Sequence, residues 1–373
     1  MNSREEITTP WWRKFDWVLL LCTLALSSFG LVMIYSATSD PGPLTLNPLV
    51  IRQFIYLIVG LLFMSIMATV DYRFLLNWKW VIYGLVLFLL TLVFVIGHTA
   101  YGSTRWIDLG PFPLQPSELA KLLMVLVLAG YLCEKKRGER DLKRLITSIC
   151  IIAPPTALVF LQPDLGTSMV LGAAWVSLVL FGGIPVKYLM RLFLLLIPFA
   201  VVGGRFLLKP YQIERIAIFL RPEDNPFGSG YNIIQATISV GSGGFWGQGF
   251  MSGSQSQLHY LRVQHTDFIA SVIGEEFGFI GMMALLVVYG LLLWRIIRIA
   301  SKARDKYGEL IAVGVAAIIL FQVFVNIGMN IQLMPVTGIP LPFISYGGSS
   351  LVTLLTSEGI LQSIILRHKK VNL

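Results

Sequence analysis

The sequence predicts an all-α integral membrane protein, a single bundle of about ten transmembrane helices with one long extracellular loop. The 373 residues are 55% hydrophobic and only 13% charged, with a mean hydropathy of +0.74, outside the range of soluble globular domains. Apolar runs recur along the chain at about the 20-residue length that crosses a bilayer. Basic residues are concentrated in alternate connections between these runs, and therefore on one side of the membrane, as the positive-inside rule requires.

The apolar runs predict ten spans in one polytopic membrane domain, residues 1–373. The spans lie near 17–36, 51–69, 79–98, 115–133, 145–161, 166–183, 189–208, 266–296, 308–329 and 345–366, with the large outer loop at 209–265. The first 16 residues are polar or interfacial, and no A-x-A-like cleavage site follows the first span. We therefore expect that span to stay as an anchor and not to be removed as a signal peptide.

The distribution of lysine and arginine predicts that both termini are cytoplasmic. In that orientation most of the 29 basic residues lie inside, including "EKKRGERDLKR" at 134–144 and "RHKK" at 367–370. Topology then accounts for the net charge of +9, which gives no reason to invoke nucleic acid. The three cysteines lack CxxC spacing and the four histidines are scattered, so neither a disulfide framework nor a metal motif is visible.

The outer connections carry the polar motifs. In "LQPSELA" (114–120) and "LQPDLGT" (161–167) a proline and a polar residue mark a helix start, which makes Asp164 a candidate cap. Glu118 and Lys121 share one helical face in the first turns of a span, where charges usually line a cavity. Capping alone also explains Asp164, and a self-satisfying ion pair also explains Glu118 and Lys121.

Two stretches of the outer loop stand out. "YQIERIAIFLRPEDNPFG" has apolar residues at helical spacing and suits a helix on the membrane surface, with Arg215 facing head groups or substrate. "GSGGFWGQGF" (241–250) lacks GxxxxGK[ST], and no predicted strand precedes it. We interpret this glycine-rich stretch as a flexible turn.

The stretch "LRVQHTDFIASVIGEEFGFIG" (261–281) turns from polar to apolar yet holds three carboxylates. On a helix from 266, Asp267 shares a narrow face with Ser271 and two glycines, Glu275 flanks that face, and Glu276 points away and needs its own partner. Asp267 lies at the outer start of this helix, where the helix dipole favours its charged form. A plain helix-end charge also explains Asp267.

Five stretches, in order and over nearly the whole chain, resemble motifs of the SEDS family (shape, elongation, division and sporulation) of cell-wall polymerases. They are "RWIDLGPFPLQPSELAK", "QPDLGTS", "GYNIIQATISVGSGGFWGQG", "HTDFIASVIGEEFG" and "PLPFISYGGSS". "GSQSQL" (253–258) and the short N-terminus are more similar to the rod-shape members than to the division members. "LRVQHTD" departs from the family, which more often has Leu-Pro-Glu before His-Thr-Asp.

The resemblance implies a peptidoglycan glycosyltransferase that polymerises lipid II, the undecaprenyl-pyrophosphate disaccharide-peptide. It implies action at the outer face of the bacterial cytoplasmic (inner) membrane, in cell elongation and rod shape, with a class B penicillin-binding protein transpeptidase as partner and membrane lipids around the bundle. It implies Asp267 as the catalytic residue. The substrate-binding positions that it implies are Arg52, Arg105, Glu118, Lys121, Asp164 and Arg215, supported by His265, Thr266 and Ser345.

The residue types agree with this chemistry. Glycosyl transfer needs a base for the proton of the acceptor hydroxyl, and a positioned carboxylate serves. The pyrophosphate leaving group needs cations, and Arg52, Arg105, Lys121 and Arg215 are basic residues kept outside against the positive-inside trend. A divalent cation between the carboxylate and the pyrophosphate is left open, because no ligand spacing establishes it.

Two other classes of function fit parts of the sequence. A lipid II flippase suits ten spans, intramembrane acids and the proline-broken segment "IIAPPTALVF", although the polar residues gather at one face and not near the midplane. A non-catalytic scaffold for a transpeptidase leaves the outer charges unexplained. Polymer formation by the purified protein separates a polymerase from both.

Overall fold

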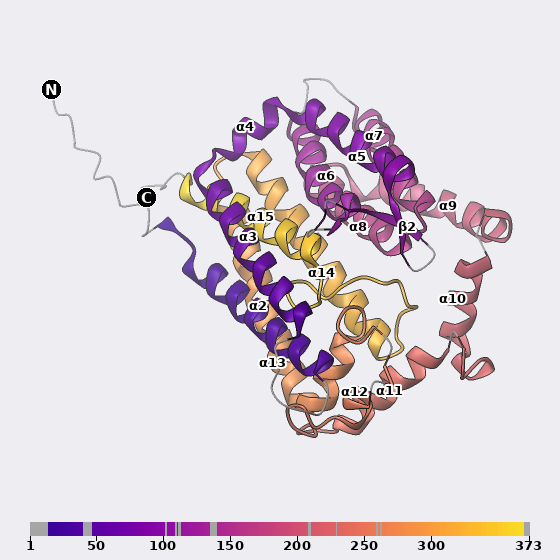
Figure 1. Ribbon diagram of the computed structural model, residues 1–373. Coiled ribbons are helices and arrows are strands. Elements are labelled where there is room, and N and C mark those ends of the chain that lie inside the picture. The colour runs from indigo at the N-terminus through magenta and orange to yellow at the C-terminus, as the bar shows by residue number, and fades with distance from the viewer. Residues whose placement is uncertain are drawn as a thin grey trace.

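The computed structural model describes residues 14–39, 47–100, 103–108, 110, 113–134, 140–207, 210–228, 230–258, 260–261 and 263–368. Over these ranges the fold is predominantly helical, as predicted (Figure 1). The helices are α2 (Trp17–Thr38), α3 (Pro48–Thr69), α4 (Tyr72–Asn77), α5 (Lys79–Ile96), α6 (Pro116–Cys133), α7 (Asp141–Leu161), α8 (Leu165–Phe181), α9 (Val186–Leu207), α10 (Pro210–Leu220), η1 (Pro222–Asp224), α11 (Tyr231–Gly243), α12 (Ser254–Gln257), α13 (Ile269–Lys302), α14 (Lys306–Asn330) and α15 (Gly348–Leu366).

Eight of the described helices are long and apolar enough to cross a membrane: α2, α3, α5, α6, α7, α13, α14 and α15. Helix α8 is apolar but shorter, with 17 residues, and α9 has 22 residues. Each predicted span overlaps one helix. The largest difference concerns α13, which extends from Ile269 to Lys302 and not from 266 to 296.

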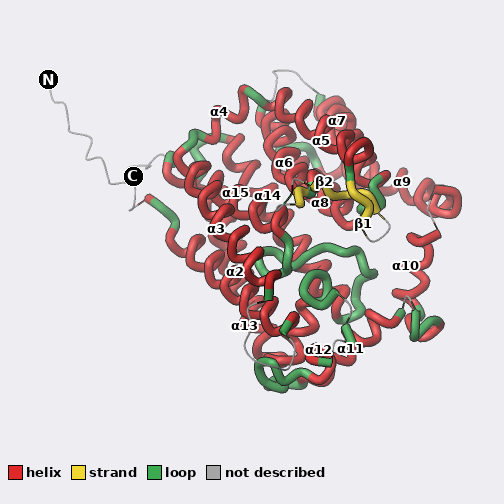
Figure 2. The backbone as a smooth tube through the Cα atoms, in the orientation of Figure 1, coloured by secondary structure: helices red, strands yellow, loops and turns green. Residues whose placement is uncertain are grey.

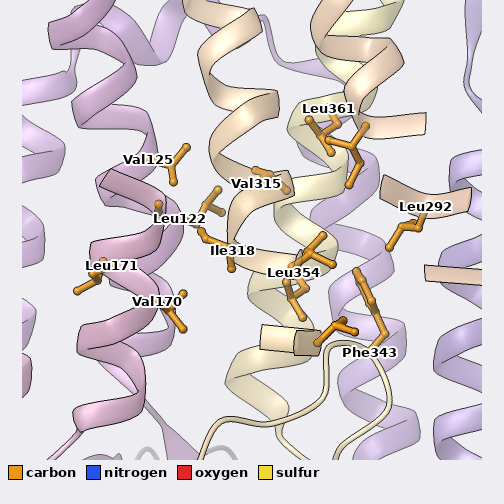
Figure 3. Packing of buried hydrophobic residues seen from close by; sticks show 14 of the residues in the cluster. Leu122, Val125, Val170, Leu171, Leu292, Val315, Ile318, Phe343, Leu354 and Leu361 are labelled. Carbon is orange, nitrogen blue, oxygen red and sulfur yellow. The ribbon is translucent and has the colours of Figure 1, made fainter. Parts of the chain in front are cut away.

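Helices α6, α14 and α15 form the centre of the bundle. In the most apolar 18-residue stretch of each helix, 78% of α6 and of α15 is buried inside the protein, whereas only 22% of α5 is buried. Figure 3 shows Leu122 and Val125 of α6 close to Val315 and Ile318 of α14. A Cβ atom at Gly314 would lie 2.5 Å from the Val125 side chain, so the small residue lets α14 approach α6 closely.

One end of the bundle gathers the connections that carry the sequence motifs, and we call it the motif end. The backbone N–H of Gln115 donates to the Ser349 hydroxyl at 2.9 Å, which links the start of α6 to the start of α15. The backbone N–H of Tyr346 donates to the carbonyl of His265 at 2.9 Å. These bonds bring together segments that are far apart in the sequence.

The opposite end, which we call the basic end, is held by charged side chains. Arg295 of α13 pairs with the Asp16 carboxylate at 2.6 Å, and Asp16 caps α2 through the N–H of Leu19. The Tyr72 hydroxyl donates to Asp305 at 2.7 Å. Glu134 and residues 140–144 of the predicted basic run lie at this end, and 135–139 are outside the described residues.

The motif end contains a small antiparallel sheet that the all-α prediction did not include. Strands β1 (His98–Ala100), β2 (Ser103–Asp108) and β3 (Pro113–Leu114) pair in the order β1-β2-β3, with Ile107 opposite Leu114. The stretch between α5 and α6 combines β-branched and aromatic residues with Gly and Pro, which is typical of hairpins. Figure 2 shows the strands in yellow, and β2 lies against α5 and α6. Strand β2 carries Arg105.

The segment 209–265, predicted as a loop, is largely helical and holds α10, η1, α11 and α12. Helix α10 covers most of the predicted amphipathic stretch, and Figure 1 shows it with α9 at the edge of the bundle. The glycine-rich stretch 241–250 forms the end of α11 and the tight connection after it. The described part of this connection is therefore structured and belongs to the motif end.

Helix α13 is broken inside its length. Gly278 has φ 63° and ψ −161°, a conformation that glycine adopts without the steric cost of a side chain. Asp267 lies before the N-cap residue Phe268 and is not helical. The predicted helical face that runs from Asp267 to Gly278 is therefore wrong.

Candidate functional site

Asp267 lies at the motif end, in the turn that leads into α13. Its backbone carbonyl accepts hydrogen bonds from the side-chain amides of Asn326 and Asn330, both at 3.1 Å. Asn330 also accepts from the N–H of Ser271, at 3.2 Å, in the first turn of α13. The two buried amides of α14 thus fix the turn, and buried polar groups of this kind hold one arrangement when they are paired.

Sequence reasoning missed these two amides. Asn326 and Asn330 lie four residues apart in "NIGMN", at the end of an otherwise apolar span. That spacing places both side chains on one helical face. Two amides on one face of a membrane helix are the signal that could have identified them.

The connection before α15 holds the same turn from its other side. The Ser345 hydroxyl donates to the carbonyl of Thr266 at 2.7 Å and accepts from the N–H of Leu341 at 2.8 Å. The rings of His265 and Tyr346 pack edge to face, with centroids 5.7 Å apart. Burial lowers the pKa of His265, which favours its neutral form. His265, Thr266 and Ser345 therefore surround Asp267 through backbone contacts.

The Asp267 carboxylate is half-buried and accessible. Among the described residues, none donates a hydrogen bond to it. Burial raises its pKa to about 6, while Arg215 and Arg105 act to lower the pKa and Asp164 acts to raise it. The expectation that the helix dipole favours the charged form is therefore corrected, because Asp267 precedes the helix and desolvation outweighs the neighbouring cations. The carboxylate can accept a proton near neutral pH.

Asp164 caps α8 and joins two other elements. Its carboxylate accepts from the N–H of Thr167 at 3.1 Å and from the Thr167 hydroxyl at 3.0 Å. The Ser117 hydroxyl of α6 donates to it at 3.3 Å. The Arg105 guanidinium lies 4.0 Å away and is anchored by the carbonyl of Gln162 at 3.1 Å. Asp164 is thus a cap and also the charge partner of Arg105.

Residues 336–339 connect the Asp164 turn to the Asp267 turn. A Cβ atom at Gly166 would lie 2.8 Å from the carbonyl oxygen of Thr337, so α8 begins in direct contact with this connection. The Arg215 guanidinium of α10 donates to the carbonyl of Val336 at 3.2 Å. Asn326 donates to the carbonyl of Ile339 at 2.7 Å. The connection therefore sets the positions of both acids and of Arg215.

Arg52 lies in the second turn of α3 with an exposed side chain. The adjacent Gln53 is buried, donates to the carbonyl of Ser345 at 3.3 Å and accepts from the N–H of Gly347 at 3.2 Å. Arg52 therefore belongs to the motif end, at its rim.

Glu118 and Lys121 form a buried ion pair inside α6. Their charged atoms are 2.8 Å apart, and each side chain is 5% exposed. The pair lines a small pocket between α6, α14 and α15, together with Leu122, Val315, Ile318, Thr353, Leu354 and Ser357. The pair thus satisfies itself and also lines a small pocket, and its role in substrate binding stays a prediction.

The other two carboxylates of the 261–281 stretch are used within the fold. Glu275 accepts hydrogen bonds from the backbone N–H groups of Gln255 and Ser256, at 2.7 and 3.0 Å. Glu276 accepts from the Ser36 hydroxyl of α2, which is the separate partner that its direction requires. Both carboxylates are therefore bound by other parts of the chain.

Comparison with known proteins places the chain in a family. The model of the cell cycle proteins FtsW, RodA and SpoVE matches residues 16–370. This chain belongs to the FtsW/RodA/SpoVE family. The family and the apolar helices make it a multi-pass membrane protein.

Curated relatives and solved structures match nearly the whole chain. The chain is 38% identical to stage V sporulation protein E of Bacillus subtilis (94% of this chain, 96% of the relative) and 37% identical to the peptidoglycan glycosyltransferase MrdB of Escherichia coli (96% of each). A chain from a study of a peptidoglycan synthase complex that coordinates polymerisation and crosslinking matches with a TM-score of 0.81 at 33% identity, over 94% of this chain and 97% of that chain. The rod shape determining protein RodA of Thermus thermophilus matches with a TM-score of 0.69 at 31% identity, over 95% and 97%.

Proposed function

We propose that this peptidoglycan glycosyltransferase polymerises lipid II into glycan strands and that Asp267 is its catalytic base. The activity class rests on family membership and on relatives of that name over nearly the full chain. The role of Asp267 rests on one observation: an accessible carboxylate without a hydrogen-bond donor among the described residues, held by its backbone beside two arginines. This group is free to bind a substrate hydroxyl.

The reaction forms one glycosidic bond and breaks one bond to pyrophosphate. The acceptor hydroxyl oxygen attacks the anomeric carbon of the donor sugar, and the undecaprenyl pyrophosphate leaves with the electron pair. Asp267 takes the proton of the attacking hydroxyl. A carboxylate whose pKa is raised to about 6 holds a proton more tightly than an ordinary aspartate, yet remains ionised at neutral pH.

Arg105 and Arg215 are positioned to meet the charge of the leaving group. Both guanidinium groups are anchored on backbone carbonyls, Arg105 on Gln162 and Arg215 on Val336. Cations that are fixed before the reaction stabilise developing charge without a cost of reorganisation. Arg52 at the rim adds a further positive charge to the motif end, and the Glu118–Lys121 pair places a lysine, paired with its own carboxylate, in the neighbouring pocket.

The motif end faces the outside of the cytoplasmic membrane in this proposal, and both termini are cytoplasmic. Support comes from the basic end, where the lysine- and arginine-rich connections lie, and from the positive-inside rule. An outward motif end meets lipid II on the side where the cell wall is built.

The partner and the cellular role are proposed from resemblance. A class B penicillin-binding protein, packing a single helix on the bundle, agrees with one structural neighbour, a chain from a study of a peptidoglycan synthase complex that coordinates polymerisation with crosslinking. The sporulation and MrdB relatives are 38% and 37% identical, which does not separate the paralogues. The role in elongation and rod shape therefore rests on "GSQSQL" at 253–258 and the short N-terminus.

For the divalent cation, we propose binding only together with the substrate. Among the described residues no group of three or more His, Cys, Asp or Glu side chains could hold a metal ion. The pyrophosphate oxygens would have to complete the coordination beside Asp267, since divalent cations take six or more oxygen ligands. Calorimetric titration with Mn²⁺ should show binding to the substrate complex and none to the free protein.

The decisive experiment uses purified protein and lipid II in detergent. Glycan strands longer than the disaccharide unit, seen on a denaturing gel, are the expected product. Movement of labelled lipid II between the leaflets of liposomes without polymer would favour the flippase. Absence of both activities would favour the scaffold.

A further inference from the structure

The break in α13 is completed by another part of the chain. At Gly278 the backbone leaves the helical conformation. The carbonyls of Glu275 and Glu276 therefore lack the hydrogen bonds that they would accept, in a regular helix, from the N–H groups four residues later. They accept instead from the N–H groups of Gln248 and Gly249, both at 2.9 Å. The glycine-rich segment therefore supplies the hydrogen bonds that the helix lacks, as buried backbone groups require.

The exchange is reciprocal. The N–H groups of Phe279 and Ile280 donate to the carbonyls of Gly244 and Phe245, at 3.0 and 3.2 Å. A Cβ atom at Gly247 would lie 2.2 Å from a carbonyl oxygen of α13, so this close approach requires glycine. The stretch predicted as a flexible turn is thus bound to α13 by backbone hydrogen bonds in both directions.

The Glu275 side chain adds a second link between the same two segments. It is fully buried, and its carboxylate accepts from the N–H groups of Gln255 and Ser256, at 2.7 and 3.0 Å, at the start of α12. Hydrogen bonds from N–H groups to a charged acceptor are about twice as strong as neutral ones. The Glu275 carboxylate thereby closes a loop that begins at Gln255 and ends at Glu275.

Asp267 lies inside this closed loop. The chain runs from Gln255 through the turn at Asp267 into α13 and returns to Glu275, two turns after Ile269. Gln257 fastens the early part of the loop by donating to the carbonyl of Ser36 at 3.1 Å. The loop is thus closed by Glu275, attached to α2 near its start, and attached to α14 at Asp267 by the two asparagine amides.

We propose that Glu275 is a positioning residue for Asp267, because its carboxylate joins the two ends of the loop that presents the base. The inference rests on the proposed role of Asp267. Removing the Glu275 carboxylate leaves the N–H groups of Gln255 and Ser256 unpaired. The segment between Gln255 and Asp267 can then move relative to α13. A displacement of the base by about 1 Å costs on the order of a hundredfold in rate.

The first test compares kcat, KM and melting temperature of the purified full-length protein acting on lipid II. Glu275→Ala should lower kcat per folded molecule at least about tenfold and change KM by less than about threefold, because the base moves while the lipid contacts remain. Glu275→Gln, which keeps one acceptor oxygen, should lie between wild type and alanine. The control is Glu223→Ala, an exposed carboxylate in the same outer segment, which should behave as wild type.

The second test replaces the carboxylate link with a covalent one. A Cβ atom at Gly253 would lie 2.6 Å from Cδ of Glu275, so the side chains of Gly253→Cys and Glu275→Cys extend into the same space and are oxidised to a disulfide that joins them. Cys22, Cys133 and Cys150 are replaced by alanine in this background. The oxidised protein should recover most of kcat, and reduction should return it to the Glu275→Ala level.

Three results would overturn the inference. They are a kcat for Glu275→Ala within about twofold of wild type, a lower melting temperature with unchanged kcat per folded molecule, and equal activity of the oxidised and reduced double-cysteine protein. If Glu275→Ala fails to fold, the kcat of the oxidised Gly253→Cys, Glu275→Cys protein decides whether the inference holds. Failure of that oxidised protein to fold also counts against the inference. Asp267→Asn separates the two proposals. Full activity of Asp267→Asn would refute the role of Asp267 as the catalytic base. An inactive Asp267→Asn together with an active Glu275→Ala would refute only the positioning role of Glu275.

Discussion

The Ser345 hydroxyl donates a hydrogen bond to the carbonyl oxygen of Thr266 at 2.7 Å, one residue before Asp267. The same hydroxyl accepts from the N–H of Leu341 at 2.8 Å, so one small side chain joins the connection before α15 to the turn before α13. Two motifs separated in the sequence by the whole of α13 and α14 thus act as one structural unit. The position of Asp267 depends on this unit as much as on its own helix.

Ser345→Ala should destabilise the protein and lower polymerisation together. The buried N–H of Leu341 loses its acceptor, and an unpaired buried donor costs about 1–3 kcal/mol. The measurement is a thermal melt in detergent beside the rate of glycan synthesis. Ser65→Ala is the matched control, because that exposed hydroxyl bonds only to its own helix at Leu61, and its effect should stay within about 0.5 kcal/mol. Equal melting temperatures for the two variants would show that Ser345 does not hold the turn.

The rate of polymerisation should fall as the pH drops through about 6. Burial raises the pKa of Asp267 to about 6, and only the deprotonated carboxylate can accept the hydroxyl proton. Arg215→Gln should move this inflection to higher pH, because the Arg215 cation lowers the pKa of Asp267. Arg221→Gln, an exposed arginine just after α10, is the control and should leave the inflection in place. A profile that is flat from pH 5 to pH 8 would contradict the assignment.

The sign of the stability effect separates this inflection from acid unfolding. Because the folded-state pKa of Asp267 is raised above the unfolded value of 3.8, its titration contributes stability that is present below pH 3.8 and is lost as the pH rises through about 6. Titration of Asp267 therefore does not unfold the protein at acid pH. A melting temperature that does not fall, and rises slightly, from pH 7 to pH 5.5 while activity falls is the expected result.

The Glu118–Lys121 pair should separate stability from activity. Lys121→Ala leaves a buried carboxylate unpaired, which costs about 3–5 kcal/mol. Replacing both, as Glu118→Gln with Lys121→Met, removes the unpaired charge and should restore the melting temperature. If the pair lines the substrate cavity, as we propose, polymerisation by the double variant stays low. Wild-type activity in the double variant would make the pair purely structural.

The proposed orientation can be tested by cysteine labelling in intact cells. Phe227, 91% exposed in the segment between α9 and α13, and Arg304, exposed between α13 and α14, lie at opposite ends of the bundle. In a background without native cysteines, a membrane-impermeant maleimide should label Phe227→Cys from outside and Arg304→Cys only after permeabilisation. The reverse pattern would refute an outward motif end.

The sequence predicted the helices well because apolar length is a local property. Each predicted span overlaps one helix, and the class of fold needs only composition and the recurrence of apolar runs. The predicted cap at Asp164 is also local, since the carboxylate binds the N–H of Thr167 three residues later. Such features depend on neighbours along the chain.

The features that escaped prediction depend on distant contacts. The start of α13 was placed too early, because Asn330 of α14 and Ser345 before α15 hold the preceding turn outside the helix. The break at Gly278 is stabilised by backbone groups about thirty residues earlier, in a stretch that composition alone describes as a flexible turn. The raised pKa of Asp267 likewise reflects burial by other segments and not its place beside a helix. Asp267 itself was identified by resemblance.

The most direct measurement of the central claim is glycan synthesis from lipid II by purified Asp267→Asn, beside a thermal melt. The amide keeps the size of the side chain and cannot accept the proton, and general-base catalysis contributes about 10²–10⁴ in rate. We predict polymerisation reduced at least about a hundredfold, with a melting temperature near that of wild type. Asp267→Glu should be nearly as slow, because about 1 Å of displacement misplaces the carboxylate. Polymerisation by Asp267→Asn within a few-fold of wild type would contradict the account and move the search for the base to Glu118 or Asp164.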